Sequence, residues 1–105
     1  MEQEDVTNVI FDDFEWNEAK ADENLKKHGV SFEEAASVFD DSFSIIFYDP
    51  DHSFEENRFI IIGMSVKINF LFVSFTERED KVRIISAREL TATERRNYEE
   101  KKQKF

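Results

Sequence analysis

The chain has 105 residues and a formal net charge of -10, and 40% of its residues are apolar, so it can form one small domain with a core. Two Gly and one Pro exclude a low-complexity or collagen-like chain, and the absence of Cys excludes disulfides, thiolate metal sites and a thiol nucleophile. The longest apolar runs, such as residues 70–73, have four residues, whereas a membrane helix needs roughly twenty.

Acidic residues are concentrated in the first half of the chain. Residues 1–56 hold seventeen acids and three bases, whereas residues 57–105 hold seven acids and eleven bases, including all six Arg. An anionic partner would therefore meet the second half, although the net charge repels nucleic acid at long range. No basic and apolar N-terminal pattern marks the chain for secretion, so we expect a cytoplasmic protein without membrane contacts.

Residues 1–13 are expected to form an acidic, flexible tail, because they carry five acids, no base and little periodicity. A single domain then spans residues 14–105. The apolar residues Val9, Ile10, Phe11 and Phe14 favour a short additional edge strand that runs up to Trp16.

Two short helices follow, each with a start signal and an apolar stripe. Asn17 is a good N-cap for the first helix, and Gly29 is typical of its end. Ser31 and Glu34 are spaced as a capping box that opens the second helix. The apolar stripes comprise Ala21, Leu25 and His28 in the first helix and Phe32, Ala35, Ala36 and Phe39 in the second.

The pattern then changes to strands, which are predicted at residues 43–48, 58–64, 69–76 and 81–88. The segment from Asp49 to His52 is typical of a turn. Thr91 and Glu94 form a second capping box that opens a C-terminal helix. This helix has few apolar residues, so we expect it either to project into solvent or to dock on a partner.

The faces of the sheet follow if Thr76 lies opposite Lys81. The face under the helices then carries Leu71, Val73, Phe75, Val82 and Ile84, and the other face carries Phe70, Phe72, Ser74, Thr76, Lys81, Arg83 and Ile85. The predicted fold class is α+β, with two N-terminal helices packed on a four-stranded, mainly antiparallel sheet and a C-terminal helix.

Several blocks of this sequence resemble the BrnT family of ribonuclease toxins from bacterial type II toxin–antitoxin systems. They are FEWNEAKADENLKKHGVSFEEAASVF, DPDHS, RFIIIG, TERE and RIISARELTATERRNYEE, which together span residues 14–100. Asn17 stands where the family usually has Asp, and either residue can cap a helix. The resemblance implies a RelE-like fold and a toxin domain over residues 14–105.

The resemblance also implies a function and partners. The expected activity is that of a metal-independent endoribonuclease without cofactors, which slows translation by cleaving RNA. A BrnA-like antitoxin with a ribbon-helix-helix DNA-binding domain would neutralise it, and promoter DNA would be bound only through that complex. A second copy of the chain is a further candidate partner.

Metal-free cleavage of RNA requires a base, positive charge at the phosphate and a proton for the leaving oxygen. The candidate catalytic residues are Arg83, Glu77, Arg78, Arg88 and His28. Arg83, inside an apolar strand, needs either an anionic ligand or an acidic partner. Arg88 lies on the opposite face under strict alternation, so both serve one site only if the strand ends or bulges between them. His28 either transfers protons or interacts with the helix dipole. Glu77 is a candidate base and Arg78 a candidate phosphate contact, and the alternative for both is a solvated turn.

Lys20, Lys27 and Lys81 are candidate RNA contacts, with solvated surface lysines as the alternative. His52 lies beside two Asp residues, but turn chemistry explains this segment, and we expect no metal site there. The alternative function is a catalytically inactive BrnT-like module that only docks an antitoxin or another protein, which the net charge of -10 favours. The nuclease hypothesis requires arginines that gather beside open surface.

Overall fold

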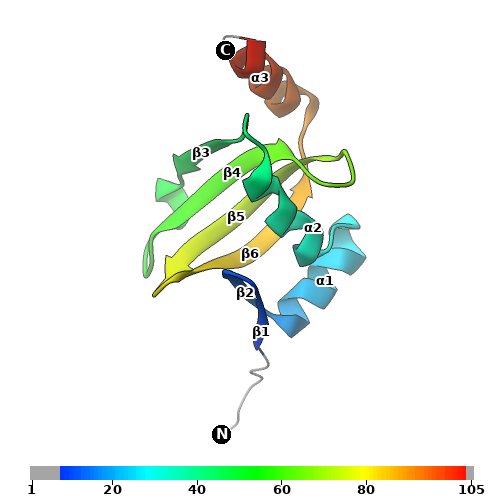
Figure 1. The fold of residues 1–105 in the computed structure, drawn as a ribbon. Helices are drawn as coiled ribbons and strands as arrows, with labels where there is room; N and C mark the ends of the chain where they lie inside the picture. Colours follow the sequence, from blue (N-terminus) through cyan, green and yellow to red (C-terminus); the bar gives the residue numbers. More distant parts are fainter. Residues whose placement is uncertain (1–7, 104–105) are drawn as a thin grey trace, which may run out of the picture.

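The structure is a computed structural model that describes residues 8–103, and it shows one six-stranded sheet, with the two N-terminal α-helices beside it and the C-terminal α-helix beyond one end (Figure 1). In chain order the strands and helices are β1 (Asn8–Phe11), β2 (Phe14–Asn17), α1 (Glu18–His28), α2 (Phe32–Ser37), η1 (Val38–Asp40), β3 (Ile45–Tyr48), η2 (Pro50–His52), β4 (Arg58–Met64), β5 (Phe70–Arg78), β6 (Lys81–Glu89) and α3 (Ala92–Gln103). None of the helices in this described part of the chain is long and apolar enough to cross a membrane.

The sheet has the order β1-β2-β6-β5-β4-β3, in which only β2 and β6 are parallel. The four predicted strands are its members β3 to β6, so the α+β class is confirmed but the number of strands was too low. A hairpin of β1 and β2 supplies the other two, where one edge strand was expected. Its turn contains Asp12 with a φ of 56°, a conformation that Asp tolerates better than most residues. Residues 1–7 of the expected tail lie outside the described residues.

Local capping places α1 and α2 as predicted. The Asn17 side chain accepts a hydrogen bond from the Lys20 N–H at 3.0 Å, and Gly29 ends α1 with a φ of 72°. The Ser31 hydroxyl accepts from the Glu34 N–H at 3.0 Å. The Glu34 carboxylate does not complete the box; it is buried and accepts from Ser65 and Asn69 of the β4–β5 loop.

The main core lies between the sheet and the helices α1 and α2. The predicted inner face is confirmed, since its residues are buried or pack against the core cluster, which includes Trp16, Val30, Phe32, Ala35, Val38, Ile61, Leu71, Val73, Phe75, Ile84 and Ala87, with Val82 at its margin. Burial of this apolar surface is the main stabilising term for the fold.

The side chain of Asn24 joins α1 to the edge of β6. It donates to the Ala87 carbonyl at 2.9 Å and accepts from the Ala87 N–H at 3.1 Å, so it pairs with the backbone as a neighbouring strand would. This edge needs a partner because β2 pairs with β6 only as far as Arg83. Helix α1 therefore lies alongside the second half of β6.

Helix α3 packs on the opposite face of the sheet, which we call the open face, and does so mainly through Tyr98. This residue is 1% exposed and belongs to a second apolar cluster with Ile60 and Ile62. Its hydroxyl donates to the Asp41 carboxylate at 2.6 Å. The expectation that this polar helix projects into solvent is confirmed for most of its length, since residues 92–101 are exposed apart from the half-buried Glu94 and the buried Tyr98. Tyr98 alone anchors the helix on its own sheet, which the sequence did not predict.

The pairing of β5 and β6 differs from the predicted register and contains a bulge. Thr76 lies opposite Arg83 rather than Lys81, because the turn between the strands has only two residues. The shift is an even number of residues, so the predicted faces remain correct up to the bulge. At Ser74 and Phe75 the register shifts, and Ile85 is the extra residue of β6.

Candidate active site

The open face carries three arginines on β4 and β6, the two strands that flank β5. Arg58 of β4 and Arg83 of β6 both lie opposite Thr76 of β5, and Arg88 lies opposite Phe72. Thr76 and Phe72 are four residues apart in one strand and therefore share a face. The bulge at Ile85 thus brings Arg83 and Arg88 to the same side of the sheet, as strict alternation would not.

A cavity of about 360 Å³ lies on this face, beside the connection between β3 and β4. Its lining combines charged, hydroxyl and apolar groups: Asp49, His52, Arg58, Phe72, Ser74, Ile85, Ser86 and Arg88. Two guanidinium groups and one imidazole therefore face one hollow on a molecule of net charge -10.

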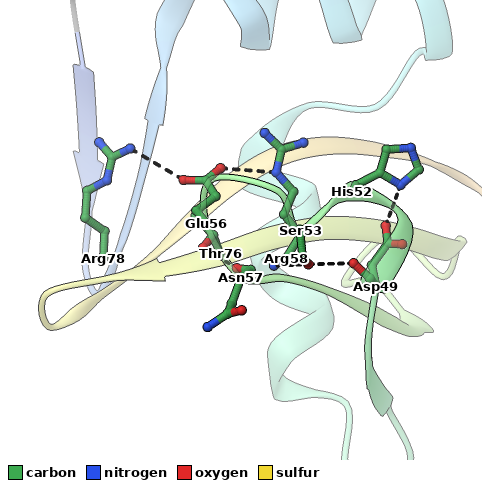
Figure 2. A network of polar contacts seen from close by, with 8 residues as sticks. All are labelled: Asp49, His52, Ser53, Glu56, Asn57, Arg58, Thr76 and Arg78. Carbon is green, nitrogen blue, oxygen red and sulfur yellow. Dashed lines mark hydrogen bonds and ion pairs between the residues drawn. The ribbon is translucent and has the colours of Figure 1, made fainter.

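The imidazole is oriented by a carboxylate from its own turn (Figure 2). His52 Nδ1 lies 2.9 Å from Asp49 Oδ2. A carboxylate at Nδ1 favours the proton on that nitrogen and leaves Nε2 as an acceptor. The turn is held to β4 by Ser53, whose hydroxyl donates to the Asp49 carbonyl at 2.6 Å and accepts from the Arg58 N–H at 2.9 Å.

Each arginine of the open face also has an acidic partner. Glu56 contacts Arg58 at 3.1 Å and Arg78 at 3.9 Å, as Figure 2 shows. Arg83 pairs with Glu15 of β2 at 3.2 Å, and its side chain is only 16% exposed. Arg58, at 34%, keeps more than twice that exposure. The arginines are therefore positioned by acids, but they differ in what they present to a ligand.

Arg88 is held from two sides. The Glu94 carboxylate accepts two hydrogen bonds from its guanidinium, at 2.9 and 3.0 Å, and the guanidinium lies 3.9 Å from the centre of the Phe72 ring. The hydrogen bond from Arg88 holds the pKa of Glu94 below its ordinary value. Glu94 also caps α3 through Thr91 in both directions, as the sequence predicted, so the C-terminal helix fixes this arginine at the cavity.

Comparison with known proteins identifies the family. The family model described as the ribonuclease toxin BrnT of type II toxin–antitoxin systems matches residues 16–94. The chain belongs to this family. No curated protein sequence matches the chain. Among solved structures, the Brucella abortus ribonuclease toxin BrnT is similar, with a TM-score of 0.56 and 22% sequence identity over 72% of this chain and 92% of that one.

Membership confirms the predicted BrnT resemblance and makes this protein the toxin of a type II system, with an antitoxin as its partner. At 22% identity, the Brucella abortus structure shows that the fold is shared.

In this BrnT-family toxin, the residues predicted to be catalytic do not all meet at the cavity. Arg88 lines it, whereas Arg83 lies on the same face without lining it. Glu77 and Arg78 are exposed at the end of β5, and Arg78 extends to Glu56. His28, in the last turn of α1, lies at a different cavity.

That second cavity, of about 180 Å³, contains two of the three predicted RNA contacts. Lys20, Lys27 and His28 line it together with Ile85 and Ser86 of β6. Lys81 lies elsewhere, at the start of β6, where its Nζ donates to the Asp12 carbonyl at 3.3 Å.

Neither Arg58 nor the pairing of His52 with Asp49 was predicted from the sequence. The turn chemistry of DPDH accounted for its residues locally, so His52 was considered only as a metal ligand. Arg58 is the first residue of an apolar strand, and only the register places it beside Thr76. Within residues 8–103, no three His, Asp or Glu side chains gather as a metal-binding cluster.

A larger cavity, of about 840 Å³, lies on the helical side of the molecule and is unsuited to RNA. Five carboxylates line it, from Asp12, Glu33, Glu34, Asp40 and Asp41, with a single lysine. These charges repel phosphate. The candidate active site is therefore the smaller cationic cavity on the open face.

Proposed function

We propose that this chain is a metal-independent, RelE-like endoribonuclease of the cytoplasm that inhibits translation, and that it uses the cavity of His52, Arg58 and Arg88. The observation that carries the proposal is the meeting of two guanidinium groups and a carboxylate-oriented imidazole in one hollow. The guanidinium groups supply the positive charge that a metal ion provides in other nucleases, and they would repel a divalent cation.

The proposed reaction is attack by the ribose 2′-oxygen on the adjacent phosphorus. His52 Nε2 accepts the proton of the 2′-hydroxyl while the 2′-oxygen forms its bond to phosphorus. The bond from phosphorus to the 5′-oxygen breaks, and that oxygen takes a proton from water entering the open cavity. The hydroxide left by this water takes the proton that His52 accepted, which restores neutral His52. Arg58 and Arg88 donate hydrogen bonds to the phosphoryl oxygens, whose charge grows in the transition state. The products are a 2′,3′-cyclic phosphate and a 5′-hydroxyl.

The other predicted residues take supporting roles in this proposal. Arg83 and Arg78 add positive charge at the margin of the open face, and Lys81 contacts RNA near the β5–β6 turn. Glu77 and His28, which lie away from the cavity, do not act as the base. A BrnA-like ribbon-helix-helix antitoxin is the proposed partner; it would cover the open face and bind promoter DNA as a complex with this chain, and a homodimer is a further proposed state.

One observation favours a second function. Each arginine of the open face already has a carboxylate partner. Arginines neutralised in this way are what a catalytically inactive module that only docks an antitoxin would contain. If RNA is cleaved in this cavity, its phosphate must replace part of the contacts that Glu56 makes with Arg58 and Glu94 makes with Arg88. Activity of the purified protein decides between the two functions.

The test compares purified wild type with His52→Ala, Arg58→Ala and Arg88→Ala on bulk RNA at low salt. We expect kcat to fall about 10²–10⁴-fold without the base and by about 10²–10³-fold without either arginine. Arg96→Ala, an exposed arginine of α3 that lines no described cavity, is the matched control and retains wild-type activity. Expression of the wild type without its antitoxin arrests growth, whereas His52→Ala does not. RNA left equally intact by wild type and His52→Ala would establish the docking module instead.

A further inference from the structure

The cavity beside α1 is lined by lysines that form no ion pair with any described acid. Lys20 and Lys27 are seven residues apart and share one face of α1, and neither forms an ion pair within residues 8–103. They differ in this from Arg58, Arg83 and Arg88, each of which is held by a carboxylate. Unpaired cations that gather at one hollow are available to bind an anion.

The rest of this cavity also suits a phosphate group. His28 and the half-buried Ser86 line it, and the Ser86 hydroxyl makes no hydrogen bond to another described side chain. Glu23 is its only carboxylate. The oxygens of one phosphate can therefore accept hydrogen bonds from both lysines and from the Ser86 hydroxyl. The negative charge of Glu23 is outweighed by the two lysines.

The two cavities have a common wall. Ile85 and Ser86 line both the cavity of His52 and the cavity of Lys20 and Lys27. These are the residues at the bulge, where β2 no longer covers β6 and α1 takes its place. A chain bound in the first cavity can thus continue over the bulge into the second.

We propose that the cavity of Lys20, Lys27 and Ser86 binds the phosphate of a nucleotide that neighbours the cleaved one. This inference rests on the proposed ribonuclease function and names its substrate class: RNA that contains at least two phosphodiester groups. A dinucleoside monophosphate, which has only the scissile phosphate, leaves this second cavity empty.

The test measures cleavage of an RNA octanucleotide and of a dinucleoside monophosphate with the same cleavable step. For the octanucleotide, Lys20→Ala/Lys27→Ala raises KM and leaves kcat unchanged; for the dinucleoside monophosphate it changes neither. The slope of log affinity against log salt falls by about 0.7, the contribution of the single phosphate contact that this cavity makes on a single strand. Lys26→Ala/Lys101→Ala removes the same charge from exposed lysines that line no described cavity, and it is the control.

Two results would overturn the inference. One is an octanucleotide KM and salt slope that change no more in the Lys20/Lys27 variant than in the control. The other is a wild-type KM that is equal for the two substrates. Failure of the ribonuclease proposal is separate, because the wild type would then cleave neither substrate. In that event, fluorescence anisotropy with a non-cleavable 2′-deoxy octanucleotide still compares the two double variants.

Discussion

Replacing Tyr98 by Phe removes one hydrogen bond and keeps the ring that docks α3. The lost bond joins the hydroxyl to a carboxylate at 2.6 Å, and hydrogen bonds to charged groups contribute about 1.5–3 kcal/mol. Asp41 keeps its bonds from the Met64 N–H at 2.8 Å and the Phe43 N–H at 3.0 Å, so it is not left unsatisfied. We therefore expect Tyr98→Phe to lower the free energy of unfolding by about 1.5 kcal/mol, the low end of this range.

Urea denaturation followed by circular dichroism measures this loss, which corresponds to a fall in Tm of roughly 6–12 °C for a domain of this size. Tyr98→Ala also removes the buried ring and costs about 3–5 kcal/mol. Tyr48→Phe is the control, because the Tyr48 hydroxyl is exposed and lies 3.3 Å from Asn57; its effect stays within about 0.5 kcal/mol.

The same bond gives a pH signature. Burial, together with the nearby Asp41, raises the pKa of the Tyr98 hydroxyl above its ordinary value of 10.0. A raised pKa stabilises the fold fully below pH 10.0 and progressively less as the pH rises through the shifted value. The stability difference between wild type and Tyr98→Phe therefore shrinks in strong alkali. A Tyr98→Phe variant as stable as wild type at pH 7 would refute the role assigned to this bond.

Three further predictions concern single residues. Gly63→Ala places a methyl group 2.9 Å from the Asp41 carboxylate that holds α3, so thermal denaturation should show a loss of about 1–3 kcal/mol. Gly29→Ala meets no atom within 4 Å but must adopt a φ of 72°, and the same measurement should show a loss of about 1 kcal/mol. Since Arg88 lowers the pKa of Glu94, the stability that this carboxylate contributes is present above pH 4.5 and is lost as the pH falls through the lowered value. Unfolding free energies of wild type and Glu94→Gln should accordingly converge in acid, and a constant difference down to pH 3 would contradict this.

Features set by neighbouring residues in the chain were predictable from the sequence. The caps at Asn17, Gly29 and Ser31 depend on a few adjacent backbone groups, and the structure has all three. Glu34 shows the limit, because its carboxylate has the spacing of a capping box yet binds a loop that is 31 residues away at Ser65. Tertiary hydrogen bonds overrode the local pattern there.

The candidate site was less predictable, because its residues are far apart in the sequence and the pairing register of the strands brings them together. Arg88 was predicted, but its shared face with Arg83 depends on a bulge that no local residue pattern indicated. His52 belongs to a turn that its Asp and Pro residues explain without any function. Arg58 lies at the same cavity as His52 only because the β3–β4 connection folds over the sheet. The family resemblance predicted the kind of protein correctly, while three-dimensional pairing decides which side chains can act together.

The bulge makes the cationic cavity depend on Ile85, a residue with no reactive group. If β6 kept regular alternation through Ile85 instead of bulging, every later residue would face the other side of the sheet, and Arg88 would enter the packed interior now occupied by Ala87. An arginine five residues after the equivalent of Arg83 therefore faces the cavity only if the bulge is kept, whereas one four residues after it needs no bulge. In this fold, the way a strand accommodates one aliphatic residue is as decisive for chemistry as a change of charge.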